Sequence, residues 1–311
     1  MLKSVFLFII TVSFTFSASG LGIPLDGPLA IKVQARNASD GIVNPGALDS
    51  FFGQLAAIEA HTRNRPVRIM QYGDSHTKAG LFTSAVQAVL ESDVTGSPSV
   101  HVRNTSYSRG SENNNSIVYQ ALGVNGARLT RLREMTENNS FLGSIAQSRP
   151  DLVVIAYGTN EVTDGNWTIE SYEHMLAQII TRIRYAAPEA SILVIGPPDR
   201  SVGGPGGWAS VKKIPLLLEA QRRAAIGSGA AFWSEYDAMG GAGSMNSWVA
   251  RGFGQGDHVH CTAAGYYRLG GMLAAELIDA YRNGPSEAIE PLNGLDLRVM
   301  RGVPLSSKTA N

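Results

Sequence analysis

The sequence has little of three things that commonly indicate a function class. Its 311 residues include one cysteine, Cys261, so an internal disulfide is excluded and stability must come from a hydrophobic core. Charge of one sign is not in excess, since 26 Lys and Arg balance 26 Asp and Glu. A clustered basic surface for nucleic acid or for an anionic membrane is therefore not indicated, and no nucleic-acid partner is expected.

Long apolar runs are also scarce, and the one that stands out lies at the amino terminus. Lys3 supplies a short positive region, residues 5–16 are almost continuously apolar, and residues 17–20 offer small side chains for cleavage. This order is typical of a secretory signal peptide, predicted for residues 1–20, with an uncleaved anchor as the alternative. The run is about half the ~20 residues that a bilayer span needs. We expect an exported protein, periplasmic or extracellular, without stable membrane insertion after cleavage.

Glycine is abundant instead, with 34 residues, and hydrophobic residues reach 44%, as in an ordinary globular chain. Apolar stretches typical of strands alternate with stretches whose apolar residues recur at helical spacing. Strands are predicted at 67–72, 100–102, 151–157, 191–195 and 230–233. Helices are predicted over 48–58, 79–90, 172–183, 215–226 and 262–281.

This alternation predicts an α/β fold built from right-handed βαβ units around a parallel sheet. Five strands favour a flavodoxin-like, three-layer sandwich in the order 2-1-3-4-5. No internal repeat and no second domain are found. The predicted organisation is a signal peptide (1–20), an N-terminal extension (21–45), one α/β domain (46–284) and a C-terminal tail (285–311). Ligands in such sheets bind beyond the carboxyl ends of the strands, so the residues that follow each strand are the candidates.

The first predicted strand is followed by Gly73-Asp74-Ser75-His76-Thr77. Gly73 permits a sharp turn. Ser75 then falls near the start of a helix, where free N–H groups and the helix dipole stabilise developing negative charge. This position suits a nucleophile, and the alternative is that Asp74 or Ser75 merely caps the helix. His76 is interpreted as a residue of the helix start and not as a base.

Two further turns offer hydrogen-bond donors. Asn160, in the block after the third strand, could donate its side-chain N–H to an oxyanion or could be an ordinary turn residue. Gly126 could present its backbone N–H, although one glycine is a weak signal by itself. In the predicted strand order the Asn160 turn lies beside the Ser75 turn, so the two form one site.

The block Asp257-His258-Val259-His260 precedes the last helix. Asp257 and His260, three residues apart, can touch in a tight turn and leave Nε2 of His260 free to take a proton from Ser75. His258 is expected to point away. A His-x-His metal pair is the competing interpretation, but the remaining histidines form no ligand cluster, so no metal or cofactor is expected. These histidines are His61, His76, His101 and His174.

Several residues that could have a function are interpreted as structural. Trp208, Trp233 and Trp248 could stack on sugar rings, but packing in the core or in loops is preferred. Cys261 is interpreted as a small buried residue. The glycine-rich stretch 203–207 does not fit a phosphate-binding loop and is interpreted as a flexible loop bordering the cleft.

Taken together, the blocks resemble the SGNH (GDSL-type) hydrolases. That family has a Ser in a Gly-Asp-Ser block, a Gly, a Gly-x-Asn block and an Asp-x-x-His block, and all are present here in order. The resemblance implies that Ser75 is the nucleophile, His260 the general base and Asp257 its orienting partner. It also implies an oxyanion hole formed by the N–H groups of Ser75 and Gly126 and the side chain of Asn160.

Further blocks are similar to bacterial peptidoglycan O-acetylesterases over roughly Leu48 to Tyr281, although the interval from Ser75 to Gly126 is too short for the carbohydrate-binding module that some members carry. The similar blocks are residues 65–69, 73–77, 158–161, 196–199, 232–233, 238–241 and 257–260. The resemblance implies a secreted serine esterase that removes O-acetyl groups from a carbohydrate polymer, peptidoglycan or another polysaccharide, through an acetyl-Ser75 intermediate. The alternatives are a polysaccharide O-acetyltransferase with the same triad and a non-catalytic protein that binds cell wall or polysaccharide.

Overall fold

The computed structural model describes residues 11–12, 29–30, 41–96 and 116–284. The predicted signal peptide, the N-terminal extension, the C-terminal tail and the strand at 100–102 therefore lie wholly or largely outside the described residues. Two short strands, β1 (Thr11–Val12) and β2 (Leu29–Ala30), pair antiparallel. In the described ranges, no helix combines the length and the apolar character that a membrane crossing requires.

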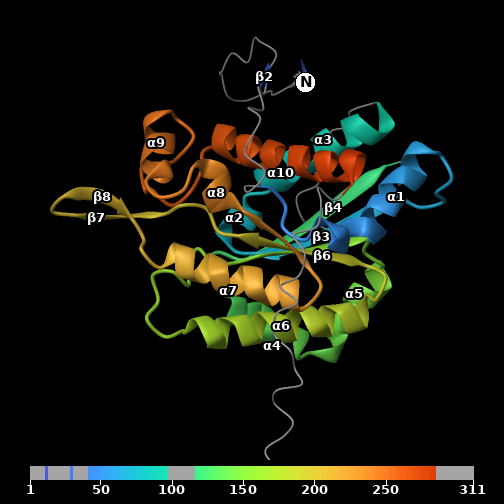
Figure 1. The fold of residues 1–311 in the computed structure, drawn as a ribbon, viewed down its shortest axis with the longest axis horizontal. Helices are drawn as coiled ribbons and strands as arrows, with labels where there is room; N and C mark the ends of the chain where they lie inside the picture. Colours follow the sequence, from blue (N-terminus) through green and yellow to red (C-terminus); the bar gives the residue numbers. More distant parts are fainter. Residues whose placement is uncertain (1–10, 13–28, 31–40, 97–115, 285–311) are drawn as a thin grey trace, which may run out of the picture.

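A five-stranded parallel sheet forms the middle of the molecule (Figure 1), as the alternating sequence pattern predicts. In spatial order its strands are β4 (Ile117–Gly123), β3 (Val67–Gly73), β5 (Leu152–Ala156), β6 (Ser191–Gly196) and β9 (Ala231–Ser234). The predicted α/β class and the 2-1-3-4-5 order are confirmed. Gly73 is paired in register with both Gly123 and Ala156, so β4, β3 and β5 end at one edge of the sheet.

Among the five strands of the central sheet, the second in chain order lies in a place that the sequence pattern did not predict. It is β4, residues 117–123, whereas the predicted strand at 100–102 falls outside the described residues. β4 is an edge strand that pairs with β3. Ile117 and Tyr119 are buried, but Leu122 is 43% exposed. Its apolar pattern is therefore interrupted, unlike the continuous run of a central strand that is buried on both faces.

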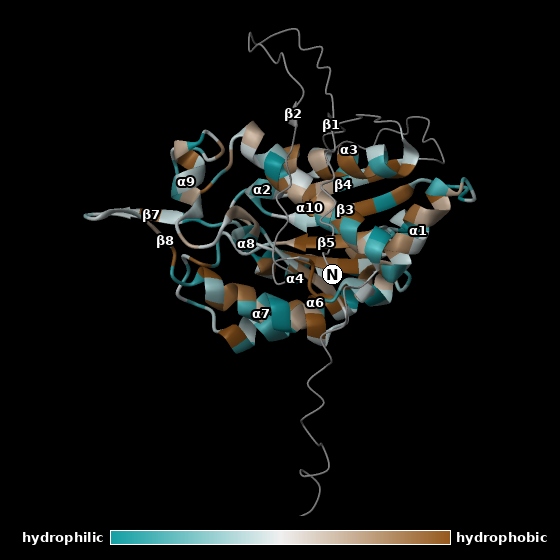
Figure 2. Cartoon of the chain, turned by 45° about the horizontal axis from the view of Figure 1, so that its top comes forward, coloured by the Kyte–Doolittle hydropathy of each residue, from teal (hydrophilic) through white to brown (hydrophobic). Residues whose placement is uncertain are grey.

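Helices cover both faces of the sheet (Figure 1). On one face lie α1 (Asp49–Glu59), α3 (Leu81–Thr95) and α10 (Ala263–Asn283), and on the other lie α4 (Leu129–Thr136), α5 (Asn139–Ser148), α6 (Ile169–Ala186) and α7 (Ile214–Gly227). Each helical layer forms a separate hydrophobic core with the sheet. Hydrophobic colour is concentrated in the strands between these layers (Figure 2).

The predicted helices are present with shifted ends. The segment predicted over 79–90 lies in α3, which runs on to Thr95, and a separate short helix, α2 (Ser75–Lys78), precedes it. A 3₁₀ turn, η1 (Pro45–Leu48), precedes α1. Thr262 caps α10 by accepting a hydrogen bond from the N–H of Gly265. Two further short helices are α8 (Glu235–Met239) and α9 (Ser244–Ala250).

The glycine-rich stretch 203–207, interpreted from sequence as a flexible loop, belongs to an ordered hairpin. Its strands β7 (Ser201–Gly204) and β8 (Gly207–Ser210) pair antiparallel and project from the body of the molecule (Figure 1). Trp208 stacks on His258 with 3.9 Å between ring centroids. Asn246 donates its side-chain N–H to the carbonyl oxygen of Trp208. These contacts, rather than strand-forming side chains, hold the hairpin against the domain.

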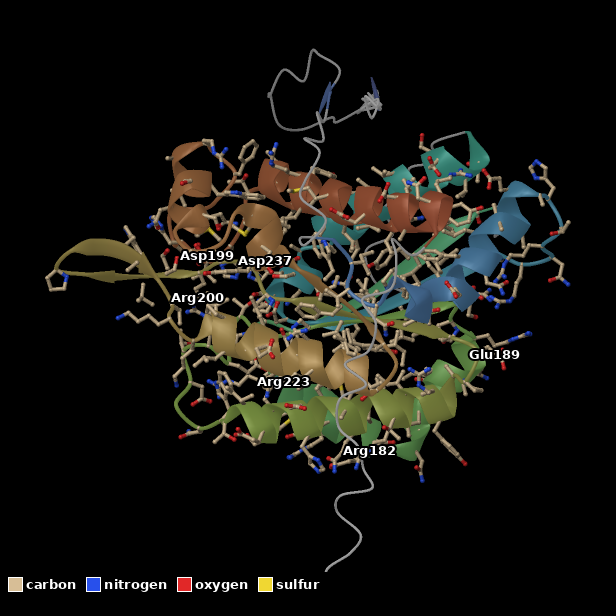
Figure 3. The ribbon with its side chains drawn as sticks, viewed as in Figure 1. Arg182, Glu189, Asp199, Arg200, Arg223 and Asp237 are labelled. Atoms are coloured by element: carbon tan, nitrogen blue, oxygen red, sulfur yellow. The ribbon has the colours of Figure 1, made fainter. Side chains whose placement is uncertain are left out.

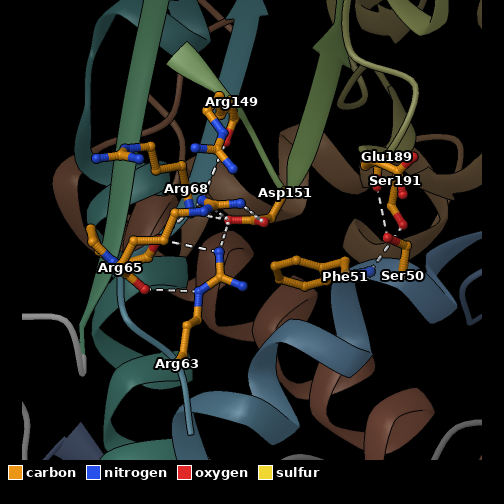
Figure 4. A network of polar contacts seen from close by, with 10 residues as sticks. Ser50, Phe51, Arg63, Arg65, Arg68, Arg149, Asp151, Glu189 and Ser191 are labelled. Atoms are coloured by element: carbon orange, nitrogen blue, oxygen red, sulfur yellow. Dashed lines mark hydrogen bonds and ion pairs between the residues drawn. The ribbon is translucent and has the colours of Figure 1, made fainter. Parts of the chain in front are cut away.

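An ion cluster lies at the amino end of β5 (Figure 4). Asp151, which is 4% exposed, accepts hydrogen bonds from the side chains of Arg63 and Arg65, each at 2.7 Å, and from the backbone N–H of Arg68 at 2.8 Å. The cluster joins β5 to the start of β3. Because parallel strands share a direction, this cluster lies at the opposite edge of the sheet from the carboxyl ends.

Candidate active site

The turn after β3 packs closely against the sheet. A Cβ atom on Gly73 would lie 2.1 Å from Oγ1 of Thr77 and 2.6 Å from the carbonyl oxygen of Ala156. Its φ is not positive. Crowding, and not the sharp turn inferred from sequence, therefore requires glycine at this position. Asp74 caps α2 by accepting the N–H of His76 at 2.9 Å, which leaves Ser75 as the first helical residue. Of the two residues that could cap the helix, Asp74 is the one that does so.

Ser75, His260 and Asp257 are joined by hydrogen bonds. Oγ of Ser75 lies 2.9 Å from Nε2 of His260, and Nδ1 of the same ring lies 2.6 Å from Oδ2 of Asp257. The first contact spans 185 positions of the chain. This order of groups can pass a proton from a hydroxyl to an imidazole while a carboxylate holds the ring and stabilises its charged form.

The Asp257–His260 turn fixes its own geometry. Oδ1 of Asp257 accepts the backbone N–H groups of Val259 and His260, each at 3.0 Å. Burial raises the pKa of Asp257, but the hydrogen bonds from His260 and Val259 outweigh it and lower that pKa to about 2. His258 points away, as expected: it has a φ of 56°, stacks on Trp208 and lies 2.8 Å from Oδ1 of Asn246 through its Nδ1.

The three groups predicted as oxyanion donors differ in their local settings. The N–H of Ser75 begins α2 and so has no acceptor within the helix. Gly126 has a φ of 71°, a conformation that favours glycine, and is exposed. Asn160 donates one side-chain N–H to the carbonyl oxygen of Ala127 at 2.9 Å. Because a side-chain amide carries two N–H groups, the second remains available to a ligand.

Glu161 connects two of these turns. Its Oε1 accepts the N–H of Leu129 at 2.6 Å, at the start of α4, while its neighbour Asn160 holds Ala127. Burial raises the pKa of Glu161 to about 7, despite hydrogen bonds that lower it. The turn that carries Gly126 is therefore tied to the turn that carries Asn160 through two side chains.

His76 is buried beside the imidazole of His260. The two rings are stacked, with 5.2 Å between centroids, and Nδ1 of His76 lies 3.1 Å from the hydroxyl of Tyr266. Burial lowers the pKa of His76, so the ring is held in its neutral form near pH 7. The sequence interpretation as a helix-start residue is correct in position, but it missed the contact with His260.

The other candidates take structural positions. Cys261 is buried, and burial raises the pKa of its thiol. Trp233 and Trp248 lie in the core, whereas Trp208 is 45% exposed at the hairpin. In the part of the chain that the structure describes, no group of three or more His, Cys, Asp or Glu side chains could hold a metal ion.

A known protein family matches the part of the chain that contains these residues. A model of the GDSL-like lipase/acylhydrolase family matches residues 72–268, from the end of β3 into α10. The chain belongs to this family. As a GDSL-like acylhydrolase, the protein is a carboxylic ester hydrolase. The matched region contains Ser75, Asn160, Asp257 and His260. No curated protein sequence matches the chain.

One of the solved structures similar to this GDSL-like hydrolase shares its fold. A peptidoglycan O-acetylesterase has a TM-score of 0.67 and 21% identity, covering 78% of this chain and 99% of its own. An acetyl xylan esterase has a TM-score of 0.47 and 14% identity, covering 69% of this chain and 99% of its own. A GDSL-like lipase from Parabacteroides merdae has a TM-score of 0.47 and 19% identity, covering 68% and 96%. The first of these establishes the shared SGNH-hydrolase fold.

Proposed function

We propose that this protein is an exported serine esterase that removes O-acetyl groups from a carbohydrate polymer. The observation that carries the proposal is the Ser75–His260–Asp257 chain of hydrogen bonds, at 2.9 and 2.6 Å, at the carboxyl edge of the sheet. Ser75 acts as nucleophile, His260 as general base and Asp257 as the group that orients His260. No metal or cofactor takes part in these steps.

The reaction has two halves. Oγ of Ser75 attacks the acetyl carbonyl carbon while Nε2 of His260 accepts the hydroxyl proton, and His260 then returns that proton to the sugar alkoxide as it leaves. Acetyl-Ser75 remains. Water gives a proton to His260, attacks the same carbonyl and releases acetate, after which Ser75 recovers its proton.

Negative charge develops on the carbonyl oxygen in both halves. The N–H groups of Ser75 and Gly126 and the second side-chain N–H of Asn160 are proposed to bind that oxygen. The bond from the Asn160 side chain to Ala127 and the bond from the N–H of Leu129 to Glu161 support this role, because they fix two of the donor turns before substrate arrives.

The substrate class and the location are parts of the same proposal. A peptidoglycan O-acetylesterase shares the fold, which supports an acetylated glycan, peptidoglycan or another polysaccharide, as substrate. Residues 1–20 have the order of a signal peptide, which supports export to the periplasm or the medium. The catalytic domain is assigned to residues 46–284, between an N-terminal extension and a C-terminal tail.

Acetate release tests the proposal. The purified protein should release acetate from O-acetylated peptidoglycan, O-acetylated exopolysaccharide or acetylated xylan, and should hydrolyse 4-nitrophenyl acetate. Ser75→Ala should reduce both rates by about 10⁴-fold or more, since the nucleophile is lost. Ser144→Ala, which removes an exposed hydroxyl on α5, is the matched control and should act as wild type. Wild-type rates from Ser75→Ala, or acetyl transfer to added glycan in place of acetate release, would contradict the proposal.

A further inference from the structure

Arg200 stands beside the site and has no role in the reaction described above. It directly follows Pro197-Pro198-Asp199 at the carboxyl end of β6 and precedes the β7–β8 hairpin. Figure 3 marks it at the base of that hairpin, next to Asp199. Its side chain is half-buried.

The guanidinium of Arg200 has one acceptor, and that acceptor is neutral. Nη1 donates to the carbonyl oxygen of Thr159 at 2.8 Å, and the buried Nε has no hydrogen-bond partner. Among the described residues, no carboxylate lies within ion-pair distance of Arg200. Its neighbour Asp199 pairs elsewhere: Oδ2 accepts the hydroxyl of Ser210 and the N–H of Met245, each at 2.9 Å, and the buried Oδ1 has no hydrogen-bond partner.

The partly buried arginines of this protein differ in their partners: Arg184 donates to the carbonyl oxygens of Ser228 and Gly229, whereas two others have a carboxylate partner. Arg63 and Arg65 share Asp151 at the far edge of the sheet. Burial disfavours a cation and lowers the pKa of Arg200, and only the more distant charges of Asp257 and Asp74 oppose that effect. Arg200 is therefore a half-buried cation that has no carboxylate partner among the described residues and keeps a buried Nε without an acceptor.

Two contacts place Arg200 between the loops of the proposed site. Thr159, which holds Nη1, is next to Asn160. On the other side, the N–H of Ser201 donates to the carbonyl oxygen of His258 at 3.0 Å, within the Asp257–His260 turn. The Arg200 side chain thus contacts the turn that carries Asn160, and the next residue of the chain contacts the turn that carries His260.

We infer that Arg200 binds a carboxylate on the sugar that carries the acetyl ester, so that the enzyme selects acidic glycans over neutral ones. This inference rests on the proposed O-acetylesterase function. Guanidinium presents two parallel N–H groups that match a carboxylate, and such charge-assisted pairs are stronger than neutral hydrogen bonds. A bound carboxylate would also supply the negative charge that Arg200 lacks among its protein neighbours.

A sugar carboxylate can come from two sources, and matched substrate pairs distinguish them. In a uronic acid it is the oxidised C6, tested by O-acetylated methyl glucuronoside against O-acetylated methyl glucoside. In a lactyl ether it is the substituent of muramic acid, tested by 6-O-acetyl-N-acetylmuramic acid against 6-O-acetyl-N-acetylglucosamine. The members of each pair differ chiefly in the acidic group, so the ratio of their kcat/KM values isolates its contribution.

Wild type should prefer the acidic member of at least one pair by about 10- to 100-fold in kcat/KM. Arg200→Gln should bring that ratio close to one, mainly through KM for the acidic substrate. Arg200→Lys should restore part of the preference, because lysine keeps the positive charge but lacks the two parallel N–H groups of the guanidinium. Arg182→Gln, on α6 at the opposite face of the sheet, is the matched control and should leave the ratio and the rates unchanged.

Two results would overturn the inference while leaving the esterase proposal intact. One is a wild-type ratio near one in both pairs. The other is an equal loss on acidic and neutral members in Arg200→Gln, which would assign Arg200 only to holding the Thr159 carbonyl. Absence of acetate release from all four sugars would instead overturn the proposed function itself, and the inference with it.

Discussion

The carboxyl groups around the site differ in how they are solvated and paired. Asp257 accepts three hydrogen bonds and has a pKa of about 2. Glu161 and Glu235 are buried, and burial raises their pKa values to about 7 and about 8, with Asp74 contributing to the rise at Glu235. Asp257 therefore stays ionised near neutral pH, whereas Glu161 and Glu235 change their protonation between about pH 6 and pH 9.

Glu235 should make stability depend on pH. It lines a small cavity with Asp74, His76 and Thr159. Folding raises its pKa from about 4.5 to about 8, so between these values the folded protein holds a proton that the unfolded chain releases. Stability should accordingly fall as pH rises through this window, by up to about 1.4 kcal/mol per pH unit. Urea unfolding of wild type and Glu235→Gln at pH 5, 6, 7 and 8 should show a flatter profile in the variant.

The exposed residue Glu134 provides a control for that experiment. Its side chain is 57% exposed, so Glu134→Gln should keep the wild-type profile. An unchanged slope in Glu235→Gln would show that Glu235 is not the group that takes up the proton on folding.

Asn160 should matter for rate more than for binding. Asn160→Ala removes one proposed oxyanion donor and should lower kcat by about 10²- to 10³-fold with little change in KM. The lost bond to Ala127 should cost about 1 kcal/mol of stability, which chemical denaturation measures separately. Asn139→Ala, an exposed substitution at the start of α5, serves as control. A variant whose KM rises while kcat is unchanged would argue for substrate binding instead.

At the scale of elements, the two ends of the strands have different tasks. The amino end of β5 carries the Asp151 cluster, which fastens it to the segment entering β3 (Figure 4). The carboxyl ends carry the turns of the site. The residues that stabilise the sheet and the residues of the candidate site therefore lie at opposite ends of the same strands.

Asp151→Asn tests this separation. Arg63 and Arg65 lose their shared counter-charge while still buried or half-buried, and breaking a buried pair costs about 3–5 kcal/mol. The midpoint of urea unfolding should fall accordingly, whereas kcat/KM for 4-nitrophenyl acetate under folding conditions should stay at the wild-type value. Glu137→Gln, which breaks only exposed pairs, should cost less than about 1 kcal/mol. A large loss of kcat in stable Asp151→Asn would disprove the separation.

Elements were predictable from sequence where burial alone decides them. β5 is buried along most of its length and α6 buries one regular face, so their patterns were clear. β4 was missed because an edge strand with an exposed end has a broken pattern. The β7–β8 hairpin was taken for a flexible loop because its glycines and Trp208 reveal nothing of the contacts with His258 and Asn246 that order it.

At the scale of the whole molecule, the candidate site depends on topology. Sequence motifs selected Ser75, Asp257 and His260, and the parallel sheet with its final helix brings them together. Their catalytic roles stay predictions. Arg200 was not selected, because its significance lies in what surrounds it: a neutral acceptor, an aspartate that bonds to other groups and two neighbouring turns. Such a relation exists only after the chain has folded.

Asp257 and His260 share one short turn, closed by the bond from the N–H of Gln255 to the carbonyl oxygen of His260 at 2.7 Å. Their mutual spacing is thus secured by nearby chain, whereas the contact from Ser75 to His260 joins segments that lie 185 positions apart in the sequence. We expect this contact to be the part of the hydrogen-bond chain that is most sensitive to heating. On gentle heating, turnover should fade when these two segments drift apart, before the global melting transition.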